Sequence, residues 1–208
     1  MAVEKHDKLN QKIFDGMEIK PEVRQKVEDI VNEFLKILAE DDVRLNVRDV
    51  ILTGSNASYN YTDKSDIDVH IIAETKSFNE VSNLYTKLYN AYHRIFEGKF
   101  DITFYGIPVE LYVETEENPV VSNGIYSIMQ KKWVKEPKAE NVPEIDQKLI
   151  DKEAKPWFDR AKKLMKEIDN GDPKGEEEIN KYFEELYELR HKGIYATQGN
   201  EFSTENLV

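Results

Sequence analysis

The feature that most constrains the fold is a segment of residues 52–74 in which polar residues join two apolar stretches, LTGSNASYNYTDKSDIDVHIIAE. The first stretch stops at Gly54, and the second begins directly after Asp66. Short apolar runs bounded by glycine and polar residues are typical of buried β-strands. We therefore predict strands at Val47–Thr53 and Ile67–Ala73, with a polar loop or short helix between them.

The second predicted strand carries two carboxylates at its beginning. Because side chains alternate across a strand, Asp66, Asp68 and His70 share one face, while Ile67 and Val69 point to the other. Two carboxylates on one face repel each other and resist burial unless a cation lies between them. Oxygen-rich carboxylate sites suit Mg²⁺ or Mn²⁺. His70 is open to two interpretations, a phosphate contact or an ordinary strand histidine.

Gly54 and Ser55 follow the first predicted strand directly. A glycine at this position lets the backbone approach a phosphate group closely. Backbone amides at the start of a following helix can hold phosphate oxygens, and the Ser55 hydroxyl can add a hydrogen bond. We therefore expect Gly54 and Ser55 to bind a nucleotide.

A third carboxylate lies further along the chain, in the sequence PVELYV. Phe100–Tyr105 and Pro108–Glu114 have the pattern of a hairpin around a glycine-containing turn. Within its second strand, Glu110 faces away from Val109 and Leu111, and an acid in an otherwise apolar strand requires a partner. If this strand neighbours the one that follows Asp66, Glu110 completes a cluster of three carboxylates.

The remaining pattern is mostly helical. Helical spacing of apolar residues predicts an amphipathic helix near the N-terminus, another between the two halves of the cluster, and several in the C-terminal third, where Pro156 should kink or split one of them. We interpret residues 1–134 as a core with an N-terminal helix, and residues 135–208 as a linker and a helical region. The expected helices are Pro21–Leu38, Phe78–Phe96, Gly124–Gln130 (short), Ile145–Ala154, Trp157–Ile168 and Glu176–Arg190.

Composition excludes several classes of protein. The 208 residues include no cysteine, which rules out disulfides, thiolate zinc sites and cysteine nucleophiles. A formal net charge of −12 disfavours extended, nonspecific binding to nucleic acid. There is no apolar run long enough to cross a membrane and no signal-peptide pattern at the N-terminus, so we expect a cytoplasmic protein.

Over residues 47–113, the Gly-Ser pair, the Asp-x-Asp pair and the later strand acid resemble the DNA polymerase β-type nucleotidyltransferase superfamily. Within it, the chain looks most like small nucleotidyltransferase-like proteins encoded by bacteriophages. The resemblance implies an α+β fold, with a mixed sheet, flanking helices and a C-terminal helical region. Many members have Asp as the third acid where this chain has Glu110, so a role for Glu110 as base is less certain than its role as ligand.

The resemblance also implies an activity. An enzyme of this type moves a nucleoside monophosphate from an NTP to an acceptor hydroxyl and releases pyrophosphate. Asp66 and Asp68 would hold two Mg²⁺ or Mn²⁺ ions, and Glu110 would hold one of them and help to deprotonate the acceptor. The acceptor is a small molecule, a protein or an RNA end. Two alternatives stay open: an inactive nucleotide-binding or interaction module, and a synthase of nucleotide second messengers.

Overall fold

The computed structural model describes residues 4–40, 44–74, 102–115, 120–144, 146–170, 175–195 and 202–203. It divides into a core unit, Val3–Val142, and a helical unit, Pro143–Val208. The helix predicted at Phe78–Phe96 lies outside the described residues. Although the described helices reach 20 residues or more, none of them combines this length with the apolarity that crossing a membrane requires.

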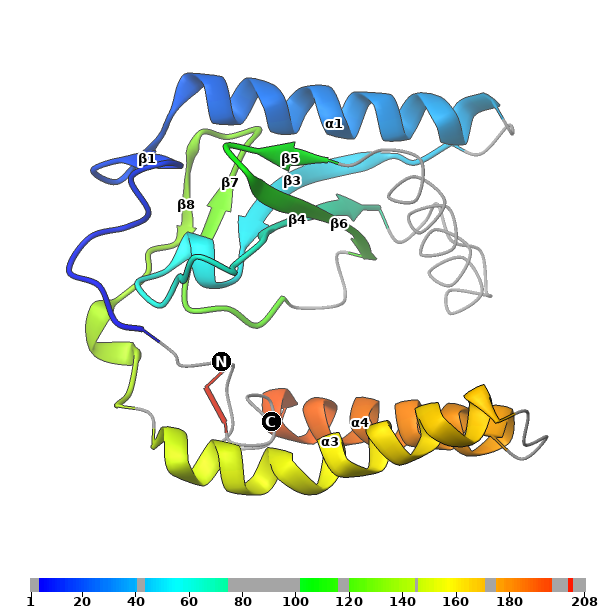
Figure 1. Cartoon of the computed structure of the whole chain (residues 1–208). Coiled ribbons are helices and arrows are strands. Elements are labelled where there is room, and N and C mark those ends of the chain that lie inside the picture. The colour runs from blue at the N-terminus through cyan, green and yellow to red at the C-terminus, as the bar shows by residue number, and fades with distance from the viewer. Residues whose placement is uncertain are drawn as a thin grey trace. The chain divides into compact units, whose positions relative to one another are not determined.

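A six-stranded mixed sheet forms the centre of the core unit, with strand order β5-β6-β4-β3-β7-β8 (Figure 1). Neighbouring strands are antiparallel except β4 and β6, which run parallel. A two-stranded hairpin of β1 and β2 precedes the first helix. The strands are β1 (Phe14–Asp15), β2 (Glu18–Ile19), β3 (Val47–Thr53), β4 (Ile67–Ala73), β5 (Thr103–Phe104), β6 (Ile107–Thr115), β7 (Ile125–Ser127) and β8 (Lys132–Lys135).

Helix α1 (Pro21–Glu40) lies along one face of this sheet (Figure 1). Its buried residues repeat at helical spacing, as expected for an amphipathic helix that faces a core. They pack with alternate residues of β4 and β6, so the apolar half of each strand faces the helix. The buried residues of α1 are Val23, Val27, Ile30, Val31, Phe34 and Leu38.

Several predictions from the sequence are confirmed. Strands β3 and β4 have the predicted bounds, α1 covers the predicted first helix, and the fold is the expected α+β arrangement with a mixed sheet. The predicted hairpin is formed by β5 and β6, while Phe100 and Asp101 of its predicted first strand lie outside the described residues. Its two turn residues, Tyr105 and Gly106, both have positive φ, 52° and 76°, as a tight hairpin turn requires.

The short helix predicted at Gly124–Gln130 is wrong. Residues 125–127 form strand β7, which pairs with β3: Tyr126 lies opposite Leu52, and Ser127 lies opposite Ile51. Burial of Tyr126 and Ile128 against α1 and β3 outweighs the local helical spacing. A three-residue strand has too little sequence to show the alternation by which strands are identified.

The helical unit contains α3 (Gln147–Asp169) and α4 (Gly175–Tyr195). Asp146 caps α3, because its side chain accepts hydrogen bonds from the backbone amides of the first turn. Pro156 lies inside this continuous helix, so it does not split the segment into two helices. The two helices are joined by a hydrogen bond from the Tyr182 hydroxyl to the Trp157 carbonyl, 3.1 Å long. Among the described loops of the core unit are two single-turn 3₁₀ elements, η1 (Ser55–Ala57) between β3 and β4 and η3 (Ala139–Asn141) after β8.

Candidate active site

Three carboxylates meet on the face of the sheet opposite α1. Asp66 lies directly before β4, Asp68 lies within β4, and Glu110 lies in β6. In the parallel pairing of these two strands, Asp68 is registered with Glu110, so their side chains leave the same face. One oxygen of each of the three carboxylates lies within 4.8 Å of the others, and all three residues are half-buried. Strands β4 and β6 are therefore adjacent in the sheet, as the predicted cluster required.

The chemistry of this cluster fits a hard divalent cation. Burial, followed by the negative charge of Glu110, raises the pKa of Asp66 above its ordinary value. Carboxylates held this close in a half-buried position are costly to ionise together, and a cation between them removes that cost. Three convergent carboxylate oxygens are the donors that Mg²⁺ and Mn²⁺ prefer. The residues present therefore fit the metal that the sequence predicted.

Gly54 is needed for this cluster for a reason that the sequence did not reveal. Its backbone has φ 71° and ψ −164°, a conformation open essentially to glycine alone. A Cβ atom built at this position would lie 1.8 Å from Oδ2 of Asp68. The Asp68 carboxylate therefore occupies the space that a side chain at position 54 would fill.

Ser55 and Gly54 both take part in hydrogen bonds within the protein. The Gly54 amide donates to the Ser122 hydroxyl at 3.2 Å, and the Ser55 hydroxyl donates to that of Ser65 at 2.7 Å. The bond between Ser55 and Ser65 joins the turn after β3 to the loop before β4. Within that loop, Ser65 also accepts a hydrogen bond from the Thr62 amide. The helix expected after Gly54 is the single 3₁₀ turn η1.

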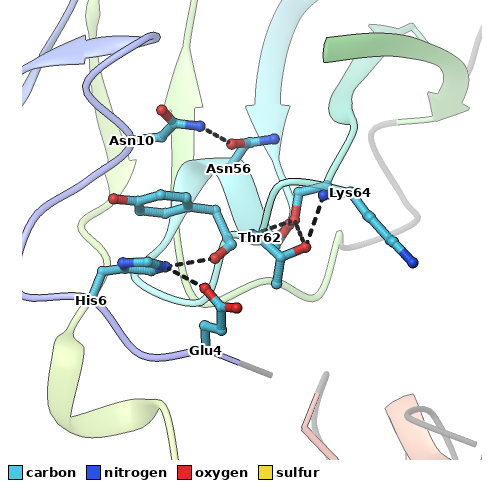
Figure 2. A network of polar contacts seen from close by, with 9 residues as sticks. Glu4, His6, Asn10, Asn56, Thr62 and Lys64 are labelled. Carbon is cyan, nitrogen blue, oxygen red and sulfur yellow. Dashed lines mark hydrogen bonds and ion pairs between the residues drawn. The ribbon is translucent and has the colours of Figure 1, made fainter. Parts of the chain in front are cut away.

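Asn56 is a supporting residue that the sequence analysis missed. Its side chain is fully buried and donates a 2.6 Å hydrogen bond to the backbone carbonyl of Asp66. Its amide oxygen accepts from Asn10 at 2.7 Å, and Figure 2 shows these two amides facing each other. Asn56 thereby fixes the backbone of Asp66 at the start of β4. The only signal in the sequence is a polar residue placed directly after Gly-Ser.

Tyr112 and His70 extend the same face beyond the carboxylates. The Tyr112 hydroxyl donates to Oε2 of Glu110, and its ring stacks on His70 with centroids 4.8 Å apart. Burial, and then the hydrogen bond to Glu110, raise the pKa of Tyr112, so it stays a protonated donor. Burial lowers the pKa of His70 from 6.5 to about 4, so His70 is neutral at pH 7. A neutral His70 brings no positive charge to a phosphate.

Comparison with known proteins agrees with this geometry. The model of the family described as "Nucleotidyltransferase domain" matches residues 31–182, which is well over half of the chain. The match includes Gly54, Ser55 and all three carboxylates. Neither the curated proteins nor the solved structures give a match. The chain belongs to the nucleotidyltransferase domain family, which lies within the polymerase β-like superfamily.

Proposed function

From this family membership, we propose that the chain transfers a nucleoside monophosphate from an NTP to an acceptor hydroxyl, with two Mg²⁺ or Mn²⁺ ions held by Asp66, Asp68 and Glu110. The observation that carries the proposal is the convergence of the three carboxylates within 4.8 Å on one half-buried face. Asp66 and Asp68 would hold both ions, and Glu110 one of them. When bound, the ions stabilise the oxygens that enter and leave the α-phosphorus.

The side chains around the site suit this transfer. The acceptor oxygen forms a bond to the α-phosphorus, the bond to the bridging oxygen breaks, and pyrophosphate leaves. Glu110 would take the proton of the acceptor hydroxyl through the oxygen that Tyr112 does not hold. Gly54 and Ser55, in the turn beside Asp68, would bind the nucleotide phosphates, with the Ser55 hydroxyl turning from Ser65 to do so.

The charge of the chain indicates which class of acceptor it uses. The net charge of −12 disfavours a long nucleic acid and favours a small molecule, a protein or an RNA end as acceptor. The cytoplasm supplies the NTP donor. We also propose that its nearest relatives within the superfamily are small nucleotidyltransferase-like proteins encoded by bacteriophages.

Label transfer from each of the four α-labelled NTPs tests the proposal. The protein is incubated with Mg²⁺ or Mn²⁺ and bacterial lysate, and label is then measured in the protein, RNA and small-molecule fractions. We expect transfer by the wild type and by the control Asp7→Asn/Asp63→Asn, which changes two exposed aspartates. We expect none from Asp66→Asn/Asp68→Asn. Equal transfer by that variant contradicts the proposal, and nucleotide binding without transfer by the wild type indicates a binding module.

A further inference from the structure

A recess of about 590 Å³ lies in the core unit and is not part of the carboxylate cluster. Its lining comes from four segments: the chain before β1, the residue before α1, the loop before β4, and the turn between β5 and β6. Polar and aromatic side chains dominate the lining. These are Asn10, Gln11, Lys12, Lys20, Tyr61 and Tyr105.

The recess lies at the same edge of the sheet as the candidate active site. Strands β4 and β6 are parallel, so both begin at one edge. Tyr61 belongs to the loop that leads into β4, and Tyr105 to the turn that leads into β6. In addition, Asn10 donates to Asn56, which donates to the Asp66 carbonyl. Two hydrogen bonds through one side chain therefore join the recess wall to the backbone of a proposed metal ligand.

The wall of the recess is held in place by its own contacts (Figure 2). The Tyr61 ring is stacked on His6, with ring centroids 3.9 Å apart and planes inclined by 10°. Nε2 of His6 donates to the Tyr61 carbonyl at 2.8 Å. Asn10 is buried, and its amide oxygen accepts from the Lys12 amide at 3.0 Å. A wall with fixed side chains loses little conformational entropy when a ligand binds.

The two lysines give the recess its charge. Within the described part of the chain, neither the Lys12 nor the Lys20 ammonium group has an ion-pair or hydrogen-bond partner. Two unpaired ammonium groups at one recess of a chain with net charge −12 favour an anion. The rings of Tyr61 and Tyr105 add flat surfaces on which a planar ring can stack.

We propose that the recess binds a small phosphorylated molecule with a planar ring, of the chemical class of a nucleoside monophosphate, and presents it as the acceptor. Lys12 and Lys20 would hold the phosphate, and Tyr61 and Tyr105 would contact the ring. That the ligand is the acceptor rests on the proposed function, whereas its binding does not.

Binding of AMP tests the inference by calorimetry in EDTA, which keeps divalent metals out of the carboxylate cluster. We expect Lys12→Ala/Lys20→Ala to bind AMP at least about tenfold more weakly than the wild type, because two charge-assisted contacts are lost. Tyr105→Ala, which removes an exposed side chain, should weaken AMP but not ribose 5-phosphate. The charge-matched control Lys26→Ala/Lys162→Ala changes two exposed lysines and should bind as the wild type does.

Two results overturn the inference: no binding of AMP by the wild type at millimolar concentration, and undiminished binding by Lys12→Ala/Lys20→Ala. Asp66→Asn/Asp68→Asn should keep its affinity for AMP, because the recess does not include those carboxylates. If the protein binds AMP through the two lysines but transfers no label, the recess is a binding site and the proposed function is wrong. If AMP neither takes up label from the NTP nor reduces transfer to acceptors in the lysate, the acceptor role is rejected.

Discussion

The two faces of strands β4 and β6 carry opposite kinds of side chain. On the face toward α1, the side chains of Ile67, Val69 and Leu111 are almost fully buried in the core. On the other face, the same strands place Asp68 and Glu110 side by side at one register position. The apolar face therefore stabilises the core unit, whereas the opposite face holds carboxylates whose partial burial is unfavourable without a partner. Neighbouring residues of a single strand should consequently respond in opposite ways to substitution.

Glu110→Gln should show the largest effect on the chemical face. Loss of this carboxylate should lower nucleotidyl transfer by on the order of 10²–10³-fold, as for other groups that stabilise charge in a transition state. The urea midpoint should stay the same or rise, because the repulsion between Glu110 and Asp66 is removed. Label transfer and urea unfolding measure the two effects. An unstable Glu110→Gln variant that keeps its transfer activity would contradict the assignment of Glu110 to the chemical face.

Leu111→Ala, one residue further along β6, should lower stability and leave transfer activity nearly unchanged. Leu111 is 1% exposed, so its truncation should lower the free energy of unfolding by about 2–5 kcal/mol. Transfer per folded molecule should be close to that of the wild type. Urea denaturation gives the first quantity, and activity at a temperature where the variant is folded gives the second.

His70, on the same face as the carboxylates, should make the stability of the protein depend on pH. Its folded pKa of about 4 lies below the ordinary 6.5, so its contribution to stability is present above pH 6.5 and is lost as pH falls toward 4. Relative to His70→Gln, the wild type should lose about 2 kcal/mol of unfolding free energy between pH 7 and pH 4.5. Urea titrations of both proteins at the two pH values give this difference. A constant difference would show that His70 is not desolvated.

Tyr112→Phe should have the smallest effect. The variant keeps the ring that stacks on His70 and loses the hydrogen bond to Glu110. Groups that orient a metal ligand typically change metal affinity by 10–100-fold, and we expect about a tenfold rise in the Mg²⁺ concentration for half-maximal transfer. Saturating Mg²⁺ should restore most of the activity. A loss of activity that Mg²⁺ does not rescue would argue against a role through Glu110.

The sequence predicted the parts of the molecule that depend on local pattern. Strand β4 alternates over seven residues, and β3 is a short apolar run that ends at Gly54; these patterns were enough to give the bounds of both strands and the shared face of Asp66 and Asp68. Strand β7 was missed because its identity depends on pairing with a strand more than 70 residues earlier in the chain. Such pairing leaves no local signal in three residues.

The contacts that support the site could not be predicted from local sequence patterns either. The Asn10–Asn56 hydrogen bond joins residues 46 positions apart, and neither side chain shows a distinctive spacing. Gly54 was predicted to admit a phosphate, but the contact visible in the fold is with Asp68. Both features follow from the tertiary arrangement, so the sequence could indicate the carboxylates but not what positions them.

The parallel register of β4 and β6 has a consequence for how relatives of this chain can diverge. Asp68 stands opposite Glu110 only because β6 enters the sheet in one alignment. A single residue inserted into β6 ahead of Glu110 would exchange its faces, directing an aliphatic side chain toward the metal ligands and the acid toward the core. Substitution can therefore accumulate along this strand, whereas changes of length should be confined to the loops beyond its ends.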